Sequence, residues 1–507
     1  MRTDDSLRQI KMGMILSYIN IIAGNLIPFF YTPIMLELLG QNEYGLYKLA
    51  SSTTSYLTLM TFGIGSAVTR YLIKANTEGG KEEEENTFGL FNLIFQIIAF
   101  LTLAVGTVIV WKLDVLYSAS LTSQELARMR ILVAVMVANT AVGFSASSYN
   151  AVVTAHERFT FINGINVIST IVTPVVNLII LYAGYLSIEM AIASLVLNLL
   201  VRVIYVIYVR DALNLRPRYT HLPLHMMGEI LKFSFWVFLS TIVSRINSST
   251  DTVIIGAIPS LATSGVAIYS VGSTFSSIMY SLAQAVSGFF TPKANKMVFS
   301  GSSNKELSDL VIRVGRMQCF VVALICSGFV AFGQPFIEFY AGSNYADAYW
   351  VAVVVMIPNC IPLVQSVAHS ILQAKNMHRF RSLTYLLIAI LNVIGTLLMV
   401  NRYGIIGAAV PTGLAYIIGQ GLIMNWYYWK KVHLDIPRFW KDLLPMLAIA
   451  AIMCLITQTL ANWINFYKLH ILCFGIVLYT IIYCILIWRF ALSSDEKSML
   501  LRAIIKK

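Results

Sequence analysis

The sequence predicts an all-α polytopic membrane protein with about fourteen transmembrane helices. Twelve of them form two six-helix lobes in pseudo-twofold repeat, and two are appended at the C-terminal end. Three observations lead to this fold class. Of the 507 residues, 58% are hydrophobic and only 12% are charged, and the mean hydropathy is +0.74; soluble domains carry about 25% charged residues. Apolar runs long enough to cross a bilayer recur along the chain, and features of its first half recur in the second.

The apolar runs define the expected helices. A crossing needs about 20 mainly apolar residues. On this criterion we expect helices at 12–38, 44–72, 88–111, 130–153, 160–183, 188–209, 231–257, 263–290, 311–334, 346–373, 381–400, 405–429, 440–461 and 468–490.

Lysine and arginine residues indicate the orientation. They collect at the N-terminus, in every second loop after it and in the C-terminal tail. Cytoplasmic loops carry this excess, so we expect both termini in the cytoplasm and an even number of crossings. These loops also account for the net charge of +12, so we expect no nucleic acid partner. The six cysteines lie in or beside apolar spans without metal-ligand spacing, so we expect no metal site.

An internal repeat divides the chain. Asn25 and Tyr47 recur as Asn247 and Tyr269, both at a separation of 222 residues. Both halves start inside and have six spans, which indicates parallel repeats related by an axis along the membrane normal. We therefore expect an N-lobe at 1–214, a cytoplasmic linker at 215–230, a C-lobe at 231–433, and appended helices with a cytoplasmic tail at 434–507.

The span 231–257 carries two charges, Arg245 and Asp251. A charge at mid-membrane costs about 2.5 to 3.5 kcal/mol and normally faces a protein interior or a water-filled cavity. Asn247 lies four residues before Asp251 and so shares its helix face. The span is therefore expected to line a polar cavity, with a structural charge pair to another helix as the alternative.

The spans 44–72 and 263–290 are rich in serine and threonine, and they occupy equivalent places in the two lobes. They also carry Lys48 and Gln284. These features favour a polar cavity, although small hydroxyl residues also allow close helix packing, which remains open. Arg70, at the inner end of 44–72, either attracts an anionic head group or extends along the helix to the membrane surface.

Catalytic motifs are missing from the sequence. It contains no GxxxxGK[ST] phosphate loop, no HExxH and no Gly-x-Ser-x-Gly elbow. We therefore expect a protein that is not an enzyme, with no catalytic residues.

Several segments resemble a known family. They are the polar first span with Pro28 and Pro33, the motifs LLGQNEYGLYKLASS and FGIGSAVTRYLIKA, and the stretch from Asp251 to Tyr269. This pattern, over essentially the whole chain, resembles the polysaccharide and oligosaccharide (O-antigen-type, lipid-linked glycan) flippases of the multidrug/oligosaccharidyl-lipid/polysaccharide (MOP) exporter superfamily. The resemblance implies a MATE-like fold in which two six-helix bundles face a central cavity lined mainly by the first, second, seventh and eighth helices.

The resemblance also implies a function. The chain is expected to flip an undecaprenyl-diphosphate-linked oligosaccharide, by alternating access, from the cytoplasmic to the outer leaflet of a bacterial plasma (inner) membrane for surface polysaccharide export. No cofactor is expected, and a proton gradient, a sodium gradient or the membrane potential is the expected source of energy. Expected partners are the substrate, the bilayer, and a glycan polymerase and glycosyltransferases of the same pathway.

Nine residues form the candidate substrate site. Arginine matches phosphate geometry, so we expect Arg245, with Lys48 or Arg70, to neutralise the diphosphate. Asp251 is a candidate for ion coupling or for holding Arg245. Tyr47, Tyr269 and Gln284, together with Tyr56 and Tyr280, offer hydroxyls, amides and aromatic edges to the glycan. Asn25 and Asn247 complete the candidate residues of the cavity.

Three other functions remain as alternatives. A multidrug or cation antiporter of the same superfamily is one alternative. Members that resemble multidrug exporters typically carry a buried carboxylate in the first helix, and the segment 11–36 contains no acidic residue, so this function is disfavoured. A membrane glycan polymerase or glycosyltransferase is disfavoured because the longest outer loops, about 111–129 and 333–344, are short. A flippase for peptidoglycan precursors shares the architecture and stays open.

Overall fold

The structure, a computed structural model, describes residues 3–493 and 496–498. These residues contain α-helices, short 3-10 and π-helical turns, and no β-strand, which confirms the all-α class. The chain divides into two compact units, 1–267 and 268–507. The boundary falls after 231–257, which the repeat assigns to the start of the second lobe; the lobe boundaries stay a prediction.

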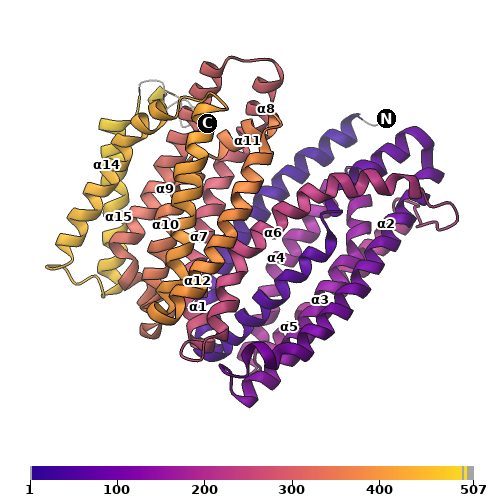
Figure 1. The fold of residues 1–507 in the computed structure, drawn as a ribbon, viewed down its shortest axis with the longest axis horizontal. Coiled ribbons are helices and arrows are strands. Elements are labelled where there is room, and N and C mark those ends of the chain that lie inside the picture. Colours follow the sequence, from indigo (N-terminus) through magenta and orange to yellow (C-terminus); the bar gives the residue numbers. More distant parts are fainter. Residues whose placement is uncertain (1–2, 494–495, 499–507) are drawn as a thin grey trace. The chain divides into compact units, whose positions relative to one another are not determined.

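The first unit is built from long helices (Figure 1). They are α1 (Thr3–Ser55), η1 (Tyr56–Thr61), α2 (Gly65–Tyr117), α3 (Ser123–Ala155), α4 (Phe159–Tyr182), α5 (Ser187–Asp211), η2 (Leu224–Met226) and α6 (Met227–Ala257). Helix α3 packs against α2 and α5, and α4 packs against α1.

Three phenylalanines show how α2 and α3 hold together. Phe88, Phe91 and Phe95 have helical spacing, so they share one face of α2. All three are buried, in a cluster that includes Val152 of α3 and Tyr205 of α5. Lipid tails are as apolar as these rings, so close packing between helices, rather than exclusion of water, stabilises the contact.

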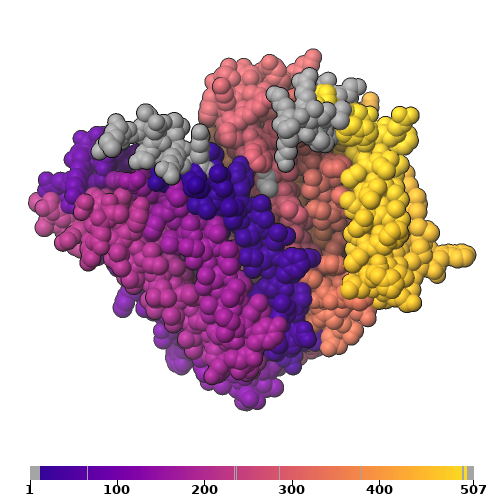
Figure 2. Space-filling view, turned by 180° about the vertical axis from the view of Figure 1, so that it is seen from behind, coloured from indigo at the N-terminus to yellow at the C-terminus, as the bar shows by residue number. Residues whose placement is uncertain are grey.

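The second unit is organised around α9. Its elements are most of α7 (Ala262–Gly288), α8 (Thr291–Phe299), α9 (Asn304–Ala341), η3 (Ser343–Tyr345), α10 (Ala348–Val364), α11 (Ser366–Ala374), α12 (His378–Tyr416), η4 (Ile417–Met424), α13 (Asn425–Lys430), α14 (Ile436–Leu460), α15 (Leu469–Leu486) and η5 (Ile487–Ala491). Helices α10, α14 and α15 all pack on α9. The last two, yellow in Figure 2, stand together at one side of this unit.

Two residues of α9 show how closely its neighbours approach. Gly315 leaves room for the Phe439 ring of α14, and a Cβ there would come within 2.4 Å of that ring. Gln318 is fully buried, and its amide donates to the Ala283 carbonyl of α7 at 3.2 Å and to Ser366 of α11 at 2.8 Å. Helix α9 is therefore the central helix of the unit.

Glycines interrupt the longest helices. Gly40 in α1, Gly80 in α2 and Gly404 in α12 have φ of 73°, 69° and 60°, and each is non-helical. Glycine adopts this region at little cost because it lacks a Cβ. Each break therefore separates two helical segments that the hydrogen-bond pattern joins into one.

The described residues contain ten helices long and apolar enough to cross a membrane, or up to twelve if two bent pairs, 224–257 and 348–374, each count as one span. Large apolar side chains such as Phe100 and Leu398 remain 70% exposed, as expected of surfaces that face lipid. The polytopic membrane fold is thus confirmed, while the count of fourteen stays a prediction. That count requires Gly40 and Gly404 each to separate two crossings.

Candidate functional site

The antiparallel seam formed by α1 and η1 with α6, within the first unit, is joined by hydrogen bonds between side-chain hydroxyls. Ser55 donates to Ser249 at 2.9 Å, and the hydroxyls of Tyr56 and Thr250 lie 2.5 Å apart. One end of the seam is closed by Gly256, where a Cβ would come within 2.4 Å of the Leu49 side chain. The seam is therefore close-packed at that end and polar in the middle.

A break follows directly on the α1 side. Thr58 and Thr61 of η1 donate their hydroxyls to carbonyls three residues back, a pattern that competes with regular helix and bends it. Phe62 and Gly63 then take positive φ of 46° and 73°. A Cβ on Gly63 would lie 2.6 Å from the Ser234 carbonyl of α6, so this position requires glycine. The predicted span 44–72 is therefore not one regular helix.

Arg245 of α6 is the half-buried cation of this region. Its Nε is buried and has no hydrogen-bond partner among the described residues. A guanidinium N–H without a partner is costly when buried, and an oxyanion that reached it would accept that hydrogen bond. Asp251, two turns further on, is buried at 5% exposure and has contacts of its own. Arg245 thus offers an unused donor, whereas Asp251 is held within the protein.

The three candidate cations lie at different heights along α6. Lys48 precedes Leu49, which contacts Gly256, and Arg70 precedes Tyr71, whose hydroxyl donates to Glu229 at 3.4 Å. Gly256 and Glu229 are eleven and sixteen residues from Arg245. The residues next to Lys48 and Arg70 thus contact α6 on opposite sides of Arg245 along the chain, and α6 is bent by 49° between 232 and 237. These contacts do not place the three cations beside one turn of α6.

A polar pocket of about 260 Å³ opens beside the seam, wholly within the first unit. Tyr47, Ser51 and Thr54 of α1 line it, together with Asn139 of α3 and Ser194 of α5. The role of Tyr47 in binding a glycan stays a prediction, and sequence reasoning missed the contributions of α3 and α5 to the pocket that Tyr47 lines. The adjacent polar pair Asn139 and Thr140, inside an otherwise apolar span, was the available signal.

The remaining candidates are dispersed. Asn25 is half-buried and donates to the Ile21 carbonyl of its own helix at 2.7 Å, whereas Asn247 is exposed. Tyr269 and Gln284 belong to α7 in the second unit. Tyr269 is buried, and Gln284 is exposed and donates to the Tyr280 hydroxyl at 2.8 Å. Of the nine candidates, the first unit contains seven.

The hydroxyl-rich face of α7 is largely satisfied by its own backbone. Thr274, Ser277 and Ser281 each donate to a carbonyl four residues back, at 2.8 to 3.1 Å. Their oxygens remain able to accept hydrogen bonds from a ligand. The enrichment in hydroxyls therefore serves helix packing and leaves a surface that accepts hydrogen bonds.

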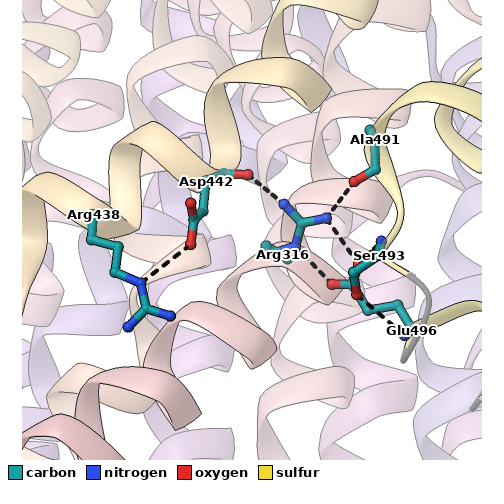
Figure 3. Close-up of polar contacts among 6 residues, drawn as sticks. All are labelled: Arg316, Arg438, Asp442, Ala491, Ser493 and Glu496. Atoms are coloured by element: carbon teal, nitrogen blue, oxygen red, sulfur yellow. Dashed lines mark hydrogen bonds and ion pairs between the residues drawn. The ribbon is translucent and has the colours of Figure 1, made fainter.

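A second polar cluster, in the second unit, anchors the C-terminal segment (Figure 3). Arg316 of α9 forms a bidentate pair with Glu496, with N–O distances of 2.7 and 2.8 Å. Its other hydrogen bonds reach the backbone carbonyls of Asp442 and Ala491. Both side chains of the pair are only about one-eighth exposed, at 13% and 12%. Each of the three guanidinium nitrogens of Arg316 thus donates within the protein, in contrast to the Nε of Arg245.

Comparisons with known proteins agree with this architecture. A family model described as polysaccharide biosynthesis protein matches residues 10–292, more than half of the chain. No curated protein matches the sequence significantly.

Solved structures show similar folds. The chain is similar to the lipid II flippase MurJ in an inward closed conformation, at 15% identity and a TM-score of 0.71 over 94% of this chain and 98% of that one. It is also similar to an inward-facing multidrug resistance MATE family transporter of the MOP superfamily, at 13% identity and a TM-score of 0.62 over 86% and 99%. A mutant of the Vibrio cholerae MATE transporter VcmN matches at 15% identity and a TM-score of 0.56 over 86% and 99%. At these identities the similarity establishes the fold.

Proposed function

Because the chain belongs to the polysaccharide biosynthesis protein family, we propose that it flips a lipid-linked oligosaccharide across a bacterial plasma membrane. The substrate is an undecaprenyl-diphosphate-linked glycan, moved by alternating access from the cytoplasmic to the outer leaflet. The similarity in fold to a lipid II flippase supports a lipid-linked substrate. In this proposal both termini are cytoplasmic, and the two six-helix lobes open alternately to either side.

The free donor of Arg245 is the observation that carries the proposal. A diphosphate needs cationic hydrogen-bond donors in a site of low dielectric, and a half-buried guanidinium with an unused N–H meets this need. Arg316 does not, because every one of its guanidinium nitrogens already donates to a protein oxygen.

The spacing of the cations refines the site. The residues next to Arg70 and Lys48 contact α6 sixteen and eleven residues from Arg245, on opposite sides of it along the chain. Arg245 therefore binds the diphosphate in the middle of its path, with Arg70 before it and Lys48 after it. The hydroxyl-lined pocket beside Tyr47 accepts hydrogen bonds from the glycan, and the polyprenyl tail stays in lipid.

The energy source is an ion gradient or the membrane potential, with no cofactor and no chemical step. Asp251 is the candidate coupling residue because it is buried and directly follows Thr250, whose hydroxyl contacts that of Tyr56. A glycan polymerase and glycosyltransferases of the same pathway are the proposed partners.

A flipping assay tests the proposal. The full chain is reconstituted in liposomes with an undecaprenyl-diphosphate oligosaccharide that carries a fluorophore, and a membrane-impermeant quencher reports the labelled lipid that reaches the outer leaflet. Arg245→Ala is expected to slow flipping roughly ten- to hundredfold, the loss of a charge-assisted hydrogen bond. Arg210→Ala, which alters an exposed arginine paired with Asp211, is the matched control and should flip normally.

The outcomes separate the alternatives. Flipping by Arg245→Ala at the wild-type rate would overturn the role of Arg245. Absence of flipping by the wild-type protein, together with export of a cationic drug, would favour the antiporter. Polymer formation from the lipid-linked substrate would favour the enzyme class.

A further inference from the structure

A cleft with a cavity volume of about 500 Å³ lies within the second unit, and none of the candidate cations lines it. It is bounded by the segment 330–335 of α9, the start of α10, the end of α14 and the loop 461–468 that joins α14 to α15. Its volume falls in the range of about 300 to 1,000 Å³ that is usual for small-molecule sites. This loop joins the end of α14 to the start of α15, so it lies at the opposite end of these two helices from Ile436 and Leu486.

The walls of the cleft are fixed by buried aromatic contacts. Phe466 of the loop is 6% exposed and packs edge-on against Phe332 of α9, with ring centroids 5.1 Å apart. The Tyr349 hydroxyl of α10 donates to the Val330 carbonyl of α9 at 2.9 Å. The loop is thus pinned by one buried ring, and the lining residues beside it are held in place.

Other aromatic rings of the same cleft are left open. Trp463 is 88% exposed, Tyr467 is 51% exposed and Trp350 is 45% exposed. The loop therefore buries one aromatic ring and presents two others.

Side-chain amides accompany these rings. Gln334, Gln458 and Asn462 line the cleft, and within the described residues their carboxamides form no hydrogen bond to the protein. Each carboxamide offers both donors and an acceptor. None of the residues that line the cleft is acidic, lysine or arginine.

We propose that this cleft is a binding site for a neutral hexopyranose glycan. A pyranose ring has an apolar C–H face that stacks on tryptophan or tyrosine, and hydroxyls around its edge that need both donors and acceptors. Exposed tryptophans with free carboxamides match these two requirements. The absence of lysine and arginine disfavours phosphate, and the absence of acidic residues disfavours a cationic drug.

Aromatic residues also gather at membrane surfaces without binding a ligand. An aromatic residue at a membrane surface needs neither a cleft nor side-chain amides without hydrogen bonds to the protein, whereas this site has both among the described residues. Trp111, 73% exposed at the end of α2 in the first unit, stacks with Lys112 instead of lining this cleft. It therefore serves as a control for the membrane-surface role.

The proposal rests on the proposed function for the direction in which the cleft opens. The proposed function puts both termini in the cytoplasm, so the end of the unit where Arg316 holds the C-terminal segment is the cytoplasmic one. The loop 461–468, at the other end, then lies at the outer surface. The cleft then holds sugar that has already crossed the membrane. The sugar comes either from a free glycan chain or from the head of the lipid-linked substrate.

Equilibrium binding to the full chain in nanodiscs tests the site. One arm uses the soluble neutral oligosaccharides maltoheptaose and chitopentaose, with saturation-transfer NMR as the readout. The other arm uses nanodiscs that contain an undecaprenyl-diphosphate-linked N-acetylglucosamine oligosaccharide, and crosslinking to a photoreactive sugar is measured. Trp463→Ala is expected to weaken binding roughly five- to tenfold, as is the double variant Gln334→Ala with Gln458→Ala, whereas Trp111→Ala should bind like the wild type.

Each result is decisive. Binding in the first arm that depends on Trp463 supports a site for sugar alone, and binding only in the second arm with the same dependence supports a site for the lipid-linked head. No binding in either arm, or equal effects of Trp463→Ala and Trp111→Ala, overturns the proposal. Flipping without glycan binding defeats this inference alone, whereas glycan binding without flipping defeats the proposed function alone.

Discussion

The pairing of Arg316 with Glu496 makes a prediction about stability that does not depend on transport. Glu496→Gln keeps the size of the side chain and removes its charge, so Arg316 loses an ionic partner while its contacts to the carbonyls of Asp442 and Ala491 remain. Both paired side chains are nearly buried, so water cannot replace the lost partner fully. The C-terminal segment is expected to become less firmly attached to α9.

The magnitude follows from the number and type of contacts. A hydrogen bond to a charged group contributes about 1.5 to 3 kcal/mol. Glu496→Gln weakens two such bonds without removing both, so we expect a loss of about 2 kcal/mol. Arg316→Ala removes all four bonds and leaves a buried carboxylate unpaired, so a loss of about 3 to 5 kcal/mol is expected.

The pH dependence supplies an independent readout. Burial by itself raises the pKa of Glu496, but hydrogen bonds from Arg316 and from the Ser493 backbone outweigh it and hold that pKa below its ordinary value. The unfolded-state pKa of glutamate is about 4.3. The contribution of the pair is therefore fully present above that pH and is lost as the pH falls through the lower, folded-state pKa. Wild type and Glu496→Gln should converge in stability only below about pH 4.

Thermal unfolding in nanodiscs, measured between pH 3.5 and 8, checks these expectations. The control is Arg438→Ala, because Arg438 pairs with Asp309 in the same unit but both side chains are nearly half exposed; such surface pairs contribute at most about 1 kcal/mol. An effect of Glu496→Gln no larger than that of the control, or a constant difference from wild type at every pH, would refute the reasoning.

Two further predictions concern the α1–α6 seam. Gly63→Ala places a Cβ on a residue with positive φ and against the Ser234 carbonyl. Thermal stability should fall by about 1 to 2 kcal/mol from the backbone alone, and flipping should slow. Gly65→Ala is the control, because no atom lies within 4 Å of its Cβ, and it should leave both unchanged. Tyr56→Phe removes the hydrogen bond to Thr250 and should cost about 0.5 to 1.5 kcal/mol; a double-mutant cycle with Thr250→Val that gives no coupling energy would contradict that contact.

The fold class and most helix positions could be predicted because hydrophobic runs and basic loops are local properties of the sequence. The expected helix ends at 38 and 400 lie beside the breaks at Gly40 and Gly404, but the sign of φ there could not be predicted, because glycine takes either sign and tertiary packing decides which. For the same reason the span 44–72 could not be recognised as an α-helix followed by a 3-10 turn, although its hydroxyl residues were visible.

Partners across helices could not be read from the sequence. Arg316 and Glu496 are 180 residues apart in the chain, and helical periodicity indicates which face a residue occupies but not which helix meets that face. Arg245 was expected to act with Lys48 or Arg70 at one diphosphate, which stays a prediction, and the segments of α6 that the neighbours of Lys48 and Arg70 contact could be identified only from the structure. The unpaired Nε of Arg245 likewise appears only once its neighbours are placed.

The free guanidinium of Arg245 also bears on permeability. A carrier that opens a hydrated path for a bulky head group risks letting protons and sodium ions leak through it. A fixed positive charge near the middle of such a path raises the electrostatic barrier to cations, as arginines do in selective pores. Nothing among the described residues accepts the Nε hydrogen bond, so in the proposed function the charge of Arg245 would remain as a barrier when the substrate is absent. Arg245 would then bind the diphosphate in the loaded carrier and insulate the membrane in the empty one.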